Sequence, residues 1–295
     1  PPDVHVAQWK EDGTVEFVEP DRWLVIATNA PLVRIKSTAI DHCSTQDHRC
    51  LTVRRGGRHE VVQARHVVDD RQWLHAGLFV GGTWAAPAGL VQFLVAAQAD
   101  GHWAGAGWDF AFMKDRKIRR LREIIEASSG ALQAAEAPVD ARGRTRFYVT
   151  GAWSRETARL LGLPGKKHFG EWLLTLLGDL LDVFNEELFH WDGCFTRKNR
   201  YSSNEVVNAN WVQTTLALRG HRARLRHYTA HGGSNWQVDV IWNTVASWTT
   251  NHEKTYVDSG GVTYCLSVPS SFVLVRRNGC VSVSGQCQNI PILLR

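Results

Sequence analysis

The chain has 295 residues, of which 44% are hydrophobic and 21% are charged. This is enough for one large domain or two ordinary ones with hydrophobic cores, and it excludes a disordered chain, a collagen-like chain or a small disulfide scaffold. No run approaches the roughly 18 consecutive apolar residues of a membrane helix, and the first residues do not resemble a secretory signal. We therefore expect a soluble, cytoplasmic protein with no membrane partner.

Lysine and arginine exceed aspartate and glutamate by five, 34 against 29. The positive charge is concentrated in two runs, 114–122 and 219–227. Each run alone is most simply a solvated face, but two runs in corresponding places favour binding to nucleic-acid phosphates. The candidate phosphate-binding residues are Lys114, Arg116, Lys117, Arg119, Arg222 and Arg224. The six cysteines lack the paired spacing of a disulfide framework, so we expect reduced thiols.

Alternating apolar residues predict strands at both ends of the chain and helices only in the middle. Asn278-Gly279, between two alternating runs, is typical of a tight hairpin turn. The sequence therefore predicts a mixed fold in which one β domain is interrupted by an inserted α/β domain. The expected strands are 4–9, 14–18, 24–27, 32–36, 50–54, 262–268, 272–275 and 281–283, and the expected helices are 88–99, 118–127 and 171–189.

Two helix-ending aspartates mark the inserted domain. Asp100-Gly101 closes one predicted helix and Asp192-Gly193 closes another. Each pair is followed by a polar stretch, by strand-like sequence (108–112 and 211–214) and by a basic run. These motifs resemble the LAGLIDADG homing endonucleases. The resemblance implies a pseudo-twofold monomer in which two helices pack side by side and each half carries a sheet that lies along the DNA major groove.

The resemblance also implies that Asp100 and Asp192 hold Mg²⁺, which activates water at a phosphodiester bond. Lys166 would be the basic residue between the motifs. Glu186, Glu187 and Trp191 occupy positions where smaller residues normally let the two helices touch. Two alternatives stay open: the glycines are simple left-handed helix stops, or the domain binds duplex DNA without cutting it.

Three short motifs mark the β domain: Thr45–Arg49, Val262–Val268 and Asn278–Cys287. In this order, around the insert, they resemble the B, F and G blocks of inteins. The resemblance implies an all-β Hint splicing domain that needs no cofactor. Thr45 and His48 would activate the upstream amide, and Cys265 would relay protons or act as a nucleophile. Gln286 would cyclise, and Cys287 would accept the upstream acyl group.

Gln286 replaces the usual asparagine, and Gly285 replaces the common penultimate histidine. The segment 287–295 resembles the Gln-Asn-Ile-Pro region of family A DNA polymerases, so the expected DNA target is an uninterrupted polymerase gene. No block A nucleophile is present, so we expect an N-terminal intein fragment with its extein as partner. A zinc site built on His42, Cys43, His48 and Cys50 is a weaker alternative. The expected domains are 1–75, 76–247, 248–286 and 287–295.

Overall fold

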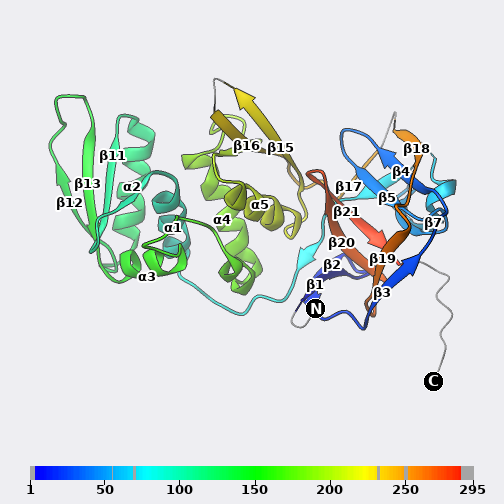
Figure 1. Ribbon diagram of the computed structural model, residues 1–295. Coiled ribbons are helices and arrows are strands. Elements are labelled where there is room, and N and C mark those ends of the chain that lie inside the picture. Colours follow the sequence, from blue (N-terminus) through cyan, green and yellow to red (C-terminus); the bar gives the residue numbers. More distant parts are fainter. Residues whose placement is uncertain (1–3, 55, 69–70, 231–232, 249–251, 287–295) are drawn as a thin grey trace. The chain divides into compact units, whose positions relative to one another are not determined.

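The computed structural model describes residues 4–54, 56–68, 71–230, 233–248 and 252–286 (Figure 1). Two compact units divide the chain: unit 1 takes residues up to 81, 216–225 and those from 240 onwards, and unit 2 takes 82–215 and 226–239. The mixed fold class is confirmed. In the described part of the chain, no helix is long and apolar enough to cross a membrane.

Unit 1 is made almost entirely of strands, and strands from the two ends of the chain pair with one another. Gln8 lies opposite Val273, and β3 and β4 pair with β19 and β18. The strands before the insert are β1 (Val6–Trp9), β2 (Thr14–Val18), β3 (Arg22–Ala27), β4 (Leu32–Lys36), β5 (Asp41–Ser44), β6 (Arg49–Val53), β7 (His59–Gln63), β8 (Gln72–Leu74) and β9 (Leu78–Phe79). Those after it are β17 (Ala246–Trp248), β18 (Glu253–Val257), β19 (Val262–Ser267), β20 (Phe272–Arg277) and β21 (Cys280–Gly285).

Two tight hairpins in unit 1 follow directly from turn residues. Between β1 and β2, the Asp12 carboxylate accepts hydrogen bonds from the backbone N–H and the hydroxyl of Thr14 at 2.9 and 2.7 Å, and Gly13 has a φ of 83°. Between β20 and β21, Asn278 and Gly279 have φ values of 47° and 75°. Consecutive positive φ values suit the twist of a two-residue hairpin. The hairpin predicted at Asn278-Gly279 is therefore confirmed.

The boundary of the insert differs from the one that the sequence suggested. Residues 76–81, 216–225 and 240–247 lie in unit 1, because β9 pairs with β2 and Leu78 bridges to Arg219. The strands β15 (Arg222–Ala230) and β16 (Gly233–Ile241) each run from one unit into the other.

The core of unit 1 forms around a cluster of fully buried apolar residues that includes Cys50. Burial raises the pKa of the Cys50 thiol to about 12, so this thiol stays protonated at neutral pH. A protonated buried thiol is a packing group rather than a metal ligand or nucleophile. The cluster consists of Val33, Ile35, Ile40, Cys50, Ala64, Val67 and Trp73.

In unit 2, helix α1 (Ala88–Asp100) is buried on most sides. It packs against α4 (Gly178–Trp191), α2 (Asp115–Ala127) and α3 (Ala152–Leu160), which explains its almost uniformly apolar sequence. The antiparallel sheet of this half turns Trp108, Phe110 and Phe112 inward, and the Phe93 and Phe110 rings lie 6.0 Å apart. Its strands are β10 (His102–Trp103), β11 (Trp108–Phe112), β12 (Gln133–Ala137) and β13 (Thr145–Thr150).

The other half of unit 2 contains α4, β14 (Arg200–Ser203), α5 (Val206–Ala217) up to Thr215, and the unit 2 parts of β15 and β16. The strand expected at 211–214 is wrong, because buried residues recur at helical spacing from Asn208 to Leu216 and fold as α5. The single helix expected over 171–189 is also wrong. A 3₁₀ turn (Glu171–Thr175) ends at Leu176, whose extended backbone lies beside Trp84, and α4 begins only at Gly178.

Candidate functional site

The two helix-ending aspartates lie at the same end of a packed helix pair. Asp100 is the last residue of α1, and Asp192 directly follows α4, which packs against α1. Burial, and secondly the negative charge of Asp100, raise the pKa of Asp192 to about 6. A neighbouring carboxylate has this effect only at short range. The structure therefore brings the two predicted carboxylates into one site.

The glycines after the aspartates are required by close packing. A Cβ atom at Gly101 would lie 2.7 Å from the Trp108 ring and 2.8 Å from the Ala97 carbonyl oxygen. At Gly193 it would lie 2.7 Å from the Phe189 ring. Gly101 has a φ of −75°, and Gly193 has no positive φ either. The alternative of left-handed helix stops is therefore wrong, and the same steric reason applies at both motifs.

Two lysines, one buried and one half-buried, lie beside the carboxylates. Lys117, in the first turn of α2, makes a close ion pair with Asp100 and is only 9% exposed. Lys167 donates to the carbonyl oxygens of Ala97 and Gly101 at 3.2 and 2.6 Å, and its pKa is lowered by burial, against the effect of both aspartates. Lys166, the predicted basic residue, is exposed and pairs with Glu205. Of these two neighbours, Lys167 is the one at the carboxylates.

A polar cavity of about 650 Å³ opens beside Asp192. Asn208, buried on α5, accepts a hydrogen bond from the Phe169 N–H at 2.8 Å and donates to the Lys167 carbonyl at 3.3 Å, which fixes the segment that carries Lys167. The Gln98 side-chain oxygen is buried and lacks a hydrogen-bond partner among the described residues. The cavity is lined by Gln98, Ala99, Gly165, Lys166, Lys167, His168, Asp192, Ser202, Ser203, Asn204, Glu205, Asn208 and Asn235.

The three residues expected to disturb the contact between α1 and α4 either face solvent or make contacts of their own. Glu186 is exposed. Glu187 is 2% exposed, pairs with Arg120 of α2 and accepts a 2.8 Å hydrogen bond from the Trp191 indole. Glu187 therefore ties α4 to α2, and Trp191 belongs to the same buried network. The sequence missed this because the partner arginine lies 67 residues away.

The predicted phosphate-binding residues are dispersed. Lys114, directly before α2, and Arg119, on α2, are exposed, whereas the Arg116 guanidinium donates to the His190 carbonyl oxygen and Lys117 is buried in its ion pair. Arg222 and Arg224 lie in unit 1, where Arg224 pairs with Cys280 of β21. These two residues therefore belong to unit 1, and their contact with DNA stays a prediction.

Instead, three strands of unit 2 carry a charged group that the sequence did not single out. Asp239 bridges Arg200 at 2.8 Å and Arg226 at 3.0 Å, and the Arg226 guanidinium donates to the Tyr228 hydroxyl at 3.2 Å. The two arginine side chains are 50% and 41% exposed. The alternation of polar and apolar residues in Gln237-Val238-Asp239 was the available signal.

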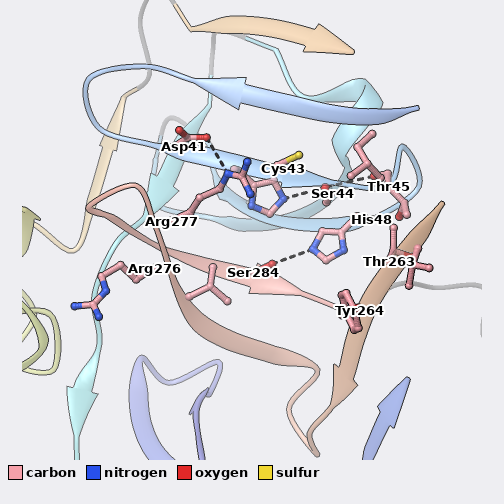
Figure 2. Close-up of a pocket in the computed structure, with 14 residues that line it drawn as sticks. Asp41, Cys43, Ser44, Thr45, His48, Thr263, Tyr264, Arg276, Arg277 and Ser284 are labelled. Carbon is pink, nitrogen blue, oxygen red and sulfur yellow. Dashed lines mark hydrogen bonds and ion pairs between the residues drawn. The ribbon is translucent and has the colours of Figure 1, made fainter. Parts of the chain in front are cut away.

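In unit 1, Thr45 and His48 line a cavity of about 400 Å³ (Figure 2). His48 Nε2 shares a 2.9 Å hydrogen bond with Ser284 Oγ, and burial lowers the pKa of His48 to about 4. The imidazole is therefore neutral at neutral pH. The lining residues are Leu32, Asp41, His42, Cys43, Ser44, Thr45, His48, Val262, Thr263, Tyr264, Val275, Arg276, Arg277 and Ser284.

Cys265 and Gln286 are not among the residues that line this cavity. The Cys265 thiol donates to the Leu266 carbonyl at 3.6 Å, and the Gln286 amide donates to the Val268 carbonyl at 3.1 Å. Cys287 and the segment up to residue 295 lie outside the described residues. Of the four residues expected to converge here, Thr45 and His48 line the cavity, and the convergence of Cys265 and Gln286 with them stays a prediction.

His42 is a neighbour of His48 that the sequence assigned only to a zinc site. Its Nε2 lies 3.0 Å from Ser44 Oγ, its ring centroid lies 5.3 Å from that of His48, and burial lowers its pKa to about 3. Across the described ranges, no three His, Cys, Asp or Glu side chains are placed to hold a metal ion. The neutral His42 instead extends the polar network of the cavity.

The chain was compared with known proteins. No family model matches. A curated relative, the ribonucleoside-diphosphate reductase subunit beta of Aquifex aeolicus (strain VF5), is 28% identical over 193 residues, which are 60% of this chain and 26% of the relative. The chain therefore spans about a quarter of that relative's length.

Similar solved structures are LAGLIDADG proteins. The homing endonuclease I-DmoI in complex with DNA and Mn has a TM-score of 0.38 at 13% identity, covering 52% of this chain and 90% of that chain. The N-terminal LAGLIDADG domain of DUF199/WhiA has a TM-score of 0.34 at 11% identity, covering 54% and 82%. Full-length DUF199/WhiA from Thermatoga maritima has a TM-score of 0.35 at 11% identity, covering 55% and 54%.

Proposed function

We propose that unit 2 is a LAGLIDADG-type unit that binds duplex DNA and cuts it at paired carboxylates. The observation that carries this proposal is the position of Asp100 and Asp192 at the same end of two packed helices, where each repels the charge of the other. Asp192 is half-buried, and both its burial and the Asp100 carboxylate raise the energy of its charged form, so this arrangement does not serve stability. Such a pair is typical of a functional site.

The donor set suits Mg²⁺. Carboxylate oxygens are the ligands that this ion prefers, and the buried Gln98 oxygen without a described partner is a further hard donor at the adjoining cavity. When bound, a divalent ion supplies activation of water and stabilisation of charge at a phosphodiester. The Lys167 ammonium is a third group at the site. It is held by two backbone carbonyls rather than by a carboxylate.

For the DNA-contacting surface we propose the exposed residues on the strands of unit 2. Arg200, Arg226 and Tyr228 stand in one group, where Asp239 limits the freedom of both guanidinium groups. In the other half, Arg146 and Tyr148 alternate with buried residues on β13. Arginines that are already oriented lose less entropy when they bind phosphates or base edges.

The test is binding and cleavage of the uninterrupted polymerase gene, the expected target, in Mg²⁺. Asp192→Asn should abolish cutting while leaving binding within about threefold, since this carboxylate serves chemistry more than affinity. Asp179→Asn, an exposed change at the other end of α4, is the matched control and should still cut. Binding without cutting by the native chain would identify a DNA-binding protein of the same design. No binding at low salt would refute the proposal.

A second function, protein splicing, is favoured by one observation in unit 1. The hydrogen bond between His48 and Ser284 joins the Thr-x-x-His motif to the strand that leads to Gln286. We propose that unit 1 is a Hint-type splicing domain that works with an N-terminal fragment and its extein. Mixing the chain with such a fragment should give a ligated product, and Cys287→Ala should prevent it. A ligated product from Cys287→Ala would show that the downstream nucleophile is another residue.

A further inference from the structure

The two halves of unit 2 differ at one equivalent position. Lys117 is the third residue of α2, and Asn208 is the third residue of α5. Lys117 pairs with the Asp100 carboxylate, whereas Asn208 uses its amide to hold the backbone around Lys167. For the described residues, the structure gives no ion pair or hydrogen bond to the Asp192 carboxylate. The Asp100 carboxylate is therefore occupied by the Lys117 ammonium, whereas the described residues place no such partner on the Asp192 carboxylate.

The ammonium of Lys117 is held in place from several directions. Its side chain is 10% exposed, and its Nζ lies 5.8 Å from the centre of the Trp191 ring, on the side of the site that carries Asp192. An aromatic face attracts a cation, and a pair shielded from water is little screened by salt. Because Lys117 lies in the first turn of α2, a helix with a buried apolar face, its backbone is fixed as well.

We propose that the Lys117 ammonium occupies, in the metal-free protein, the place beside Asp100 where a divalent cation would bind, so that Asp192 is the carboxylate that takes the first ion. This inference rests on the endonuclease function proposed for unit 2. An ammonium ion and a metal ion compete for the same carboxylate oxygen, because each needs the lone pairs that the other uses. The pseudo-twofold site is thus asymmetric before any DNA is bound, and the DNA strand at Asp192 is cut first.

Terbium(III) alone, in the absence of DNA, is a suitable probe, because tryptophan sensitises its luminescence and Trp191 directly precedes Asp192. The native chain should show one tight terbium site. Asp192→Asn should abolish that site, whereas Asp100→Asn should change its affinity by less than about threefold, since that carboxylate is already paired. Lys117→Met should raise the terbium affinity of a second, weak site at Asp100 by about tenfold, because it removes the one ammonium that competes for this carboxylate.

Arg155→Met is the matched control, because it removes one positive charge from an exposed position on α3 and should leave both sites unchanged. Lys117→Arg, which keeps the charge, should behave like the native chain. If Lys117→Met does not fold, the comparison of Asp100→Asn with Asp192→Asn decides alone.

Equal weakening of the tight site by Asp100→Asn and Asp192→Asn would overturn the inference, since the two carboxylates would then share one ion. That result would leave the endonuclease proposal standing. Terbium binding that neither substitution changes would instead refute the carboxylate site itself, and with it both proposals. The two failures are therefore distinguishable in one titration series.

Discussion

Replacing Asp192 by asparagine should stabilise the metal-free protein at high pH. Burial and the Asp100 carboxylate raise the pKa of Asp192 from 3.8 to about 6, so the folded chain resists losing this proton. A carboxyl whose pKa is higher in the folded state holds its proton there while the unfolded chain has already released it. The native chain therefore loses stability as the pH rises through the interval between the two pKa values, and asparagine avoids the loss because it does not titrate.

The size of the effect follows from the two pKa values. Their difference corresponds to about 3 kcal/mol of unfolding free energy when Asp192 is fully charged, near pH 8. Near pH 4.5 the carboxyl is still mostly protonated in the folded chain, and the cost is only about 1 kcal/mol. The advantage of Asp192→Asn over the native chain should therefore grow by about 2 kcal/mol between these two pH values.

Urea unfolding in EDTA at both pH values measures this growth. Asp179→Asn, an exposed change at the other end of the same helix, is the matched control for removing a carboxylate outside the site. If the difference between Asp192→Asn and the native chain does not depend on pH, the charge of Asp192 is not penalised in the folded state. The reasoning that places two repelling carboxylates in one site would then be wrong.

Three further predictions concern other contacts. Glu187→Ala should lower the unfolding free energy of unit 2 by about 1–3 kcal/mol in urea, because the buried Trp191 indole loses its acceptor and the half-buried Arg120 keeps only Glu123, and an unchanged midpoint would contradict this. Arg226→Ala should reduce the salt slope of DNA binding by about one, whereas Arg155→Ala should not, and equal slopes would remove β15 from the interface. Gly285→Ala should destabilise unit 1 by about 1–3 kcal/mol because it overpacks the strand, and an unchanged urea midpoint would show that the backbone of Arg49 yields freely.

Local patterns in the sequence were sufficient where the contacts that decide the structure are local. The expected strands 14–18 and 32–36 match β2 and β4, and the Asn-Gly turn of the last hairpin forms because both residues tolerate a positive φ. Helix α1 was recognisable because an apolar run of that length has few other solutions.

Contacts between distant residues were not recoverable from pattern. The choice of Lys167 over its neighbour Lys166 depends on two carbonyl groups at the end of α1, about 66–70 residues away. The pairing of Ser284 with His48 spans 236 residues and leaves no periodic signal. Arg222 and Arg224 were misplaced because one continuous strand, β15, passes from one unit to the other. The density of charged residues along the sequence does not indicate that a strand passes from one unit to the other.

The close approach of Gly285 to β6 has a consequence for how this chain can change over evolutionary time. A Cβ atom at position 285 would lie 2.2 Å from the Arg49 carbonyl oxygen, and Arg49 directly follows His48. A histidine therefore cannot be introduced at 285 by one substitution without displacing the backbone next to the buried imidazole. Substitutions at position 285 and in the 48–49 segment are therefore coupled. A lineage can acquire a bulkier residue at 285 only after the 48–49 segment has been remodelled, so the glycine is retained unless both segments change together.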